Sequence, residues 1–301
     1  MRKINKASTL LTGLFIIFAA ALNVFAQQQQ TPQANGKDGV ALAPARYELE
    51  MPPGTETTVV VNINYHTSRT DAQAFRIVAS LNDWTINKDG QVEYFKSGTR
   101  PNSASPWMIY SPGEVSVQPG QLHSIRVTIS VPKDAAPGDH LAALIVESRA
   151  DKIKLAQNQR QVLVRYRMAS MFYIKVPQLT RHGSLQNLQA TSNAGGIIVI
   201  PTIKNEGNSV IRPLTSLTIT DAANHIVAGL PESERAPLLG ATEISQPLMI
   251  DKALLPGTYS VKYRVDFQDG GKPTEGITEF VVKENASHKP ATTTASSARE
   301  N

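Results

Sequence analysis

The sequence predicts an all-β protein with two immunoglobulin-like β-sandwich domains in tandem behind a cleaved signal peptide. The first observation is alternation: in residues 125–131, Ile or Val occupies every second position, which is typical of a strand with one face on a core and one in water. The second is a repeated phrase in which Pro-Gly and a few polar residues precede an alternating segment, at Pro53, Pro119 and Pro256. Short strands that follow such turns are typical of immunoglobulin-like sandwiches.

Residues 1–26 have the pattern of a secretory signal peptide. A basic start is followed by the apolar run 10–21, and Val24 and Ala26 supply small residues at the positions where signal peptidase cuts. An uncleaved anchor is the alternative, but the apolar run is short for a membrane span. Residues 27–39 are then a polar, disordered linker, and residues 284–301, rich in Ser, Thr and Ala, are a disordered tail.

The chain contains no cysteine, which excludes disulfides and a lipoprotein anchor. An exported protein without disulfides must be stabilised by its own core, and it fits a bacterial envelope better than a eukaryotic extracellular space. The formal charge of +5 includes Arg2, Lys3 and Lys6, so the cleaved chain carries about +2. Because no basic cluster is interleaved with aromatic residues, nucleic acid is not expected as a partner. No second apolar run is long enough for a stable membrane span after cleavage.

The first domain is expected to span residues 40–177. Its opening strand, residues 41–49, is interrupted by Pro44, which suits an edge position because proline cannot donate to a ladder. Residues 87–90, Asn-Lys-Asp-Gly, are a hairpin turn signal. Trp84 and Trp107 are expected to be core or sheet-covering aromatic residues rather than residues that stack on a ligand. Further strands are expected at residues 57–64, 74–82, 108–110, 125–131 and 141–146.

A long run, residues 161–176, is predicted to be the last strand of this domain, and Pro177 ends it. At 3.3 Å per residue it would reach roughly 50 Å, more than a small sandwich needs. Arg165 and Arg167 point to one face of its first half, and four apolar residues share the other. These four residues are Val162, Val164, Tyr166 and Met168.

The second domain is expected to span residues 178–283, again all-β. Residues 204–208, Lys-Asn-Glu-Gly-Asn, are a turn signal between strands. Its strands are expected at residues 197–203, 210–211, 216–220, 248–250, 259–267 and 276–282.

No motif for catalysis is present. The six histidines are scattered without metal-ligand spacing, and there is neither a Gly-rich phosphate loop nor a Gly-x-Ser-x-Gly elbow. The spacing of the Asp and Glu residues does not indicate any pair that would act as general acid and general base. The sequence therefore predicts a protein that is not an enzyme and that binds no metal and no cofactor.

Three local features resemble the periplasmic pilus and fimbrial assembly chaperones of the PapD type. They are the strand at residues 45–47 followed by a Pro-Gly turn and Thr-Thr-Val-Val-Val-Asn-Ile, the Val-Gln-Pro-Gly phrase at residues 117–120 before its alternating strand, and the run that ends at Pro177. The resemblance covers residues 40–283 in architecture. It implies an exported β-rich, pilin-like subunit as partner, an outer-membrane assembly partner, and a periplasmic location.

In that family the chaperone lends a long strand to a subunit that lacks one, through main-chain hydrogen bonds and alternate side chains. The resemblance makes the four apolar residues of run 161–176 the lent side chains; ordinary core packing is their alternative role. Arg46 matches the strand arginine that holds the subunit's terminal carboxylate, and pairing with Glu48 or Glu50 is its alternative role. The family's second basic anchor falls on Phe172, which the resemblance makes a partner-binding position although it is not basic, so this anchor is expected to be half missing.

A non-catalytic envelope or cell-surface binding module, which recognises its partner through loops, is the alternative function. The WxL-interacting proteins are similar in their two-sandwich plan and Pro-Gly strand openings, but they also carry a C-terminal membrane anchor. A hydrolase is a distant third, because nothing supplies a nucleophile or a base.

Overall fold

The computed structural model describes residues 39–70, 72–149, 165–193 and 195–283. The predicted signal peptide and tail, and the first residues of the predicted long strand, including Val162 and Val164, lie outside these ranges. No helix in the described ranges is long and apolar enough to cross a bilayer. Strands dominate, and one short 3-10 turn, Ser105–Trp107, is the only helical element among the described residues.

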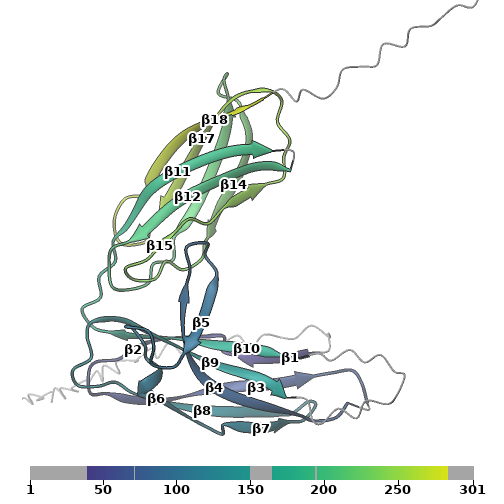
Figure 1. The fold of residues 1–301 in the computed structure, drawn as a ribbon, viewed down its shortest axis with the longest axis vertical. Helices are drawn as coiled ribbons and strands as arrows, with labels where there is room; N and C mark the ends of the chain where they lie inside the picture. The colour runs from purple at the N-terminus through teal and green to yellow at the C-terminus, as the bar shows by residue number, and fades with distance from the viewer. Residues whose placement is uncertain (1–38, 71, 150–164, 194, 284–301) are drawn as a thin grey trace, which may run out of the picture. The chain divides into compact units, whose positions relative to one another are not determined.

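The first sandwich consists of two sheets (Figure 1). One sheet has the strand order β1 (Gly39–Ala43), β3 (Glu56–His66), β8 (Leu122–Ser130) and β6 (Met108–Ser111). The other has the order β2 (Arg46–Glu50), β10 (Arg167–Val176), β9 (Gly138–Arg149), β4 (Phe75–Ile86) and β5 (Val92–Lys96), and β7 (Glu114–Val117) also pairs with β4. This division of mostly antiparallel strands between two sheets is that of an immunoglobulin-like sandwich, as the sequence predicts.

The chain changes sheets at Pro44. Before it, β1 pairs antiparallel with β3; after it, β2 pairs parallel with β10. The interruption predicted at this proline is therefore present, and it separates two short strands that belong to different sheets. This change places β2 beside the last strand of the sandwich.

Both sheets contribute to one hydrophobic core. In β8 the residues at every second position from Ile125 to Ile129 are almost fully buried, as their alternation predicts. From the opposite sheet, Ile77 and Ala79 of β4 and Phe172 of β10 enter the same cluster. Burying each such branched or aromatic side chain contributes about 1.5–3 kcal/mol.

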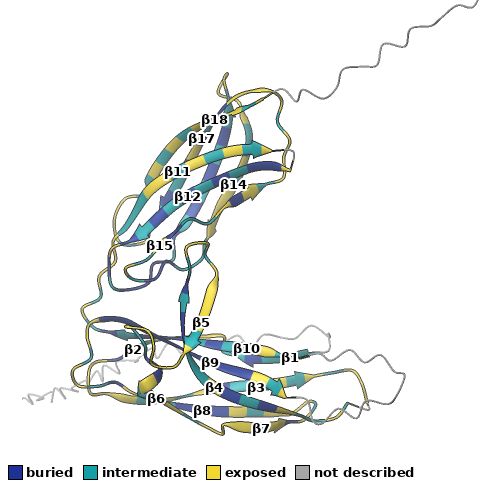
Figure 2. Ribbon diagram, in the orientation of Figure 1, coloured by how far each residue is buried: buried dark blue, intermediate teal, exposed yellow. Residues whose placement is uncertain are grey.

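Strand β9 is buried on both faces over most of its length, as Figure 2 shows. Ala142 and Leu144 face the core of the first sandwich. Leu141, Ala143 and Ile145 belong to a second cluster, which also contains the core of the second sandwich. The strand predicted at residues 141–146 is therefore present, and its apolar side chains enter two different clusters.

Trp84 lies on the second of these faces and is 1% exposed. Its indole Nε1–H donates to the carbonyl oxygen of Ala142 at 3.0 Å, and its ring meets that of Tyr173 edge to face, with the centroids 5.1 Å apart. Trp107 is only partly buried and packs against His140. Both tryptophans are therefore packing residues, as predicted: Trp84 lies in the interior, and Trp107 packs, partly buried, against the core of the first sandwich.

A fully buried carboxylate, Asp83, organises the polar loop at residues 97–105. It accepts hydrogen bonds from the backbone N–H groups of Gly98, Thr99 and Arg100 at 2.8–3.2 Å. The hydroxyls of Ser103 and Ser105 donate to it at 2.5 and 2.6 Å. Burial alone would raise the pKa of Asp83, but these hydrogen bonds outweigh burial and hold the pKa below its usual value.

The second sandwich has the same kind of construction. One sheet pairs β11 (Gly183–Asn193) with β12 (Gly196–Asn205), and the short strands β15 (Glu243–Ile244) and β16 (Leu248–Ile250) pair with β12. The other has the order β14 (Ile226–Glu234), β13 (Leu214–Asp221), β17 (Gly257–Asp266) and β18 (Thr274–Val282). Strands β11 and β14 were not among the predicted strands, because polar residues interrupt the apolar pattern in both.

Candidate partner-binding site

Strand β10 is covered by β2 over only half of its length. The parallel ladder runs from Met171, opposite Arg46, to Lys175, opposite Glu50. The N–H of Met171 donates to the carbonyl oxygen of Ala45 at 2.9 Å. Because backbone groups alternate in direction along a strand, those of Arg167 and Ala169 face the same edge. Within the described ranges, no strand pairs with that edge before Met171.

Two of the predicted partner-binding residues lie beside this open edge. Met168 is half-buried and packs against the core of the first sandwich. The ring of Tyr166 lies 5.8 Å from that of Phe75, on the same face of the sheet. Both side chains therefore border the core where β10 begins. The other two apolar residues of the predicted stripe, Val162 and Val164, lie outside the described residues.

Phe172 is a core residue. It is 0% exposed, and its ring stacks on that of Tyr47 with the centroids 5.1 Å apart. The structure contradicts the expectation that the side chain of Phe172 contacts a partner, because the core of the first sandwich covers this side chain completely.

A charged cluster surrounds Glu48 on the opposite face of the β2–β10 pair. The carboxylate of Glu48 is 2.7 Å from Lys175 Nζ, 2.7 Å from Arg212 Nη2 and 3.1 Å from Arg46 Nε. Burial alone would raise the pKa of Glu48, but the hydrogen bonds from Lys175 and Arg212 hold it below its usual value. One carboxylate therefore faces three cations, and Arg46, with its side chain 51% exposed, is the most accessible of them.

The cluster changes the interpretation of the basic anchor. In the parallel register, Arg46 lies opposite Met171, so its side chain shares a face with Lys175 and not with Phe172. The second cation beside Arg46 is thus Lys175, two residues before Pro177, and Arg212 of the second sandwich is a third. The sequence does not show this, because the register of a parallel pair 125 residues apart leaves no local signal.

No group of three or more metal-binding side chains occurs in the ranges that the structure describes. The site consists instead of an open strand edge, two apolar side chains beside it, and a cationic cluster at the point where β2 begins.

Comparisons with known proteins find no matching family model and no matching curated protein. Among solved structures, the class 5 fimbrial chaperone CfaA is 14% identical over 81% of this chain and 100% of its own, with a TM-score of 0.40. A chain of the chaperone–tip adhesin complex of CFA/I fimbriae is 11% identical over 80% and 98%, with a TM-score of 0.42. The CsuC–CsuE pre-assembly complex of Acinetobacter baumannii contains a chain that is 15% identical over 79% and 97%, with a TM-score of 0.41.

Proposed function

We propose that this protein is a periplasmic chaperone that holds an exported β-rich, pilin-like subunit by pairing the open end of β10 with it. The observation that carries the proposal is the edge of β10 before Met171, which no strand of the described residues pairs with and which Tyr166 and Met168 border. An exposed strand edge is a hazard that soluble proteins usually block. An edge that adjoins apolar side chains fits a partner strand.

Two kinds of interaction would hold the subunit. Backbone N–H and C=O groups of Arg167 and Ala169 would bond to a strand of the subunit, which gives affinity independent of sequence. The apolar residues at alternate positions, from Val162 to Met168, would fill a groove in the subunit where it lacks a strand of its own. They would also set the register between the two chains.

The charged cluster favours one direction for the subunit strand. A strand beside the open edge lies end to end with β2, which runs parallel to β10. If the subunit strand is also parallel, its last residue meets Arg46 at the start of β2, and its terminal carboxylate pairs with that guanidinium. An antiparallel strand would instead bring a positive N-terminus to the same cations, which is unfavourable.

Replacing Tyr166 and Met168 together by Asp is expected to abolish recovery of the subunit, because charged side chains cannot enter an apolar groove. The measurement is purification of the tagged mature protein from the periplasm of its own host, with mass spectrometry of the co-eluting proteins. The matched control replaces Ile109 and Leu122, two exposed apolar residues outside the site, by Asp.

A second pair of variants tests the open edge of β10 without placing a charged side chain next to the core. Ala169→Pro removes an N–H that faces the open edge, where proline is tolerated, and we expect at least a tenfold loss of subunit; Ala169→Ser keeps the N–H and should bind normally. Recovery of the unaltered protein alone, as a stable monomer, would contradict the proposal and favour the loop-binding module.

Removing the charge of Arg46 is expected to weaken the subunit complex by about tenfold or more, since a hydrogen bond to a charged group contributes about 1.5–3 kcal/mol. The measurement compares the affinity of Arg46→Met with that of Arg126→Met, which alters an exposed arginine on the other sheet. Amidation of the subunit's C-terminus should reproduce the loss and make the Arg46 variant indistinguishable from the unaltered protein. An equal effect of both arginine variants would contradict the anchor.

A further inference from the structure

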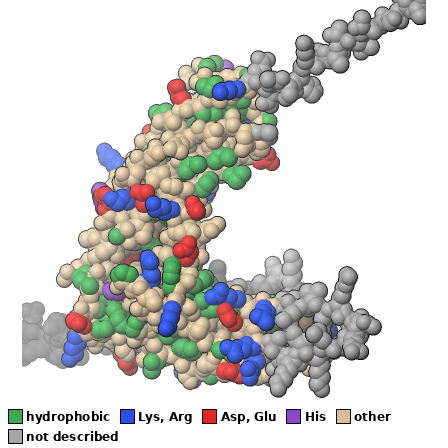
Figure 3. All heavy atoms as spheres, in the orientation of Figure 1, with side chains coloured by type: hydrophobic (Ala, Val, Ile, Leu, Met, Phe, Trp, Pro, Cys, Tyr) green, Lys and Arg blue, Asp and Glu red, His purple; other side chains and the backbone are tan. Residues whose placement is uncertain are grey.

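Four arginines gather at the end of the first sandwich where β4 begins and β9 ends. Arg76 of β4 lies directly opposite Arg149 of β9, and Arg167 of β10 lies opposite Glu147 of β9. Arg165 precedes Arg167 by two positions, so its side chain has the same direction. We call these four residues the arginine patch. Figure 3 shows basic side chains, mixed with acidic ones, at this end of the sandwich.

Only half of this positive charge is neutralised within the described residues. Arg76 pairs with Glu114 at 3.0 Å and Arg167 with Glu147 at 2.7 Å. Neither Arg149 nor Arg165 makes an ion pair or a side-chain hydrogen bond in the described part of the chain, and both are exposed. Like charges placed directly opposite on neighbouring strands destabilise a sheet; Glu114 offsets this cost for Arg76, whereas Arg149 has no acidic partner among the described residues. An acidic partner would remove this cost.

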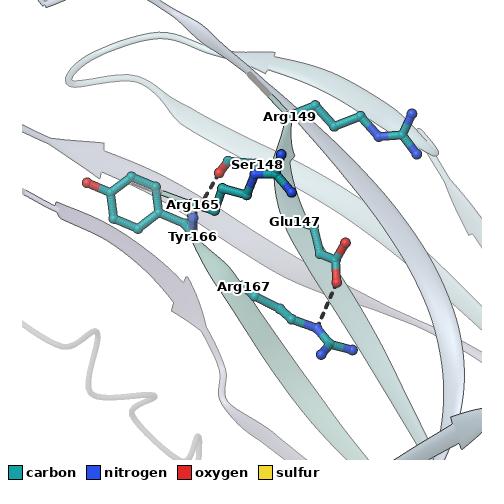
Figure 4. Close-up of a pocket in the computed structure, with 6 residues that line it drawn as sticks. All are labelled: Glu147, Ser148, Arg149, Arg165, Tyr166 and Arg167. Atoms are coloured by element: carbon teal, nitrogen blue, oxygen red, sulfur yellow. Dashed lines mark hydrogen bonds and ion pairs between the residues drawn. The ribbon is translucent and has the colours of Figure 1, made fainter. Parts of the chain in front are cut away.

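The patch borders a hollow of about 510 Å³ beside the start of β10. Figure 4 shows that Arg149, Arg165 and Arg167 extend to one side of the paired strands, and that Tyr166 extends to the other. The N–H of Tyr166 donates to Ser148 Oγ at 2.8 Å, which holds the two strands together at this point. A subunit strand on the open edge would therefore meet apolar side chains on one face and guanidinium groups on the other.

We propose that the arginine patch binds acidic side chains at alternate positions of the subunit strand that pairs with β10. This inference rests on the proposed function and adds a charge requirement to it. Residues two apart on a strand are separated by about 6.6 Å, so carboxylates at positions i and i+2 of a neighbouring strand come level with Arg165, which has no acidic partner among the described residues, and with Arg167, which would share its guanidinium between the carboxylate and Glu147. Arginine is suited to this role because its guanidinium binds a carboxylate through two parallel hydrogen bonds.

The surroundings favour a protein strand over an anionic membrane surface. Two carboxylates, Glu114 and Glu147, pair with arginines of the patch. These carboxylates would repel a dense layer of anionic headgroups. The patch also adjoins backbone groups of β10 that pair with no described strand; a peptide strand can bond to them, whereas a layer of lipid headgroups cannot align with them.

The test measures binding of labelled 12-residue peptides to the purified mature protein by fluorescence anisotropy. One peptide alternates Val with Asp, and a second has the same composition with all Asp residues at one end. We expect the alternating peptide to bind at least tenfold more tightly. Arg149→Ser combined with Arg165→Ser should raise its Kd tenfold or more, whereas Arg126→Ser should change it less than twofold.

Three outcomes would overturn the inference: equal binding of the two peptides, an unchanged Kd in the double arginine variant, or arginine-dependent binding to vesicles of anionic phospholipid without binding to the peptide. Recovery of the native subunit separates this failure from failure of the proposed function. If the Tyr166 and Met168 variant loses the subunit while the double arginine variant retains it, strand pairing stands and the charge requirement is wrong. If all variants retain it, the proposed function itself is wrong.

Discussion

Replacing Trp84 by alanine is expected to lower the free energy of unfolding by about 3–5 kcal/mol, the usual cost of truncating a buried tryptophan. The side chain is 1% exposed and contacts Tyr173 edge to face. Truncation leaves a cavity, and it also leaves the carbonyl oxygen of Ala142 without the indole donor. The measurement is urea denaturation followed by far-ultraviolet circular dichroism, because loss of a tryptophan changes the fluorescence signal itself.

Two further variants separate the contributions to this loss. Trp84→Phe keeps an aromatic ring but removes the N–H, so part of the stability should return. Trp107→Ala truncates a tryptophan that is only partly buried, and its effect should be clearly smaller. Equal losses for the alanine variants at positions 84 and 107 would mean that burial does not determine the effect.

Replacing Asp83 by asparagine is expected to cost about 2–4 kcal/mol at neutral pH, since charged acceptors form the stronger hydrogen bonds and a buried N–H left unpaired costs about 1–3 kcal/mol. The amide keeps the shape of the carboxyl group but offers only one acceptor oxygen to three backbone N–H groups and two hydroxyls. Urea denaturation at pH 7 measures the loss.

The same carboxylate predicts a pH dependence. The pKa of Asp83 is held below its usual value in the folded protein, so the stability it contributes is fully present above the unfolded-state pKa of about 3.9 and disappears as the pH falls through the lower folded-state pKa. The difference between the unaltered protein and Asp83→Asn should therefore shrink below about pH 4. A difference that stays constant down to pH 2 would show that the carboxylate is not the source of the effect.

Much of the fold can be predicted from the sequence because it depends on patterns between residues that are close together in the chain. Alternation predicts the buried residues of β8. Pro44 predicts the break between β1 and β2, because proline cannot donate to a ladder. Neither observation says which sheet each half of the broken strand joins. That depends on pairing with β3 and β10, far away in the sequence.

The candidate site is less predictable for the same reason. Tyr166 and Met168 follow from alternation, but the grouping of Arg46 with Lys175 and Arg212 depends on a parallel register and on a residue of the second sandwich. The role of Asp83 could not be predicted either. In the sequence Asp83 is one acidic residue in a strand. Its five hydrogen-bond donors come from the loop at residues 97–105, and the sequence alone does not predict the conformation in which that loop turns its donors toward the carboxylate.

The short parallel strand β2 also bears on self-association. An uncovered β10 would offer ten residues of ladder to any extended chain, including another copy of this protein. By covering the segment from Met171 to Lys175 with its own strand, the protein shortens the edge on which edge-to-edge aggregation could start. Among the described residues, only the part of the β10 edge before Met171 has no covering strand, and β2 covers the rest, which limits growth into stacked assemblies.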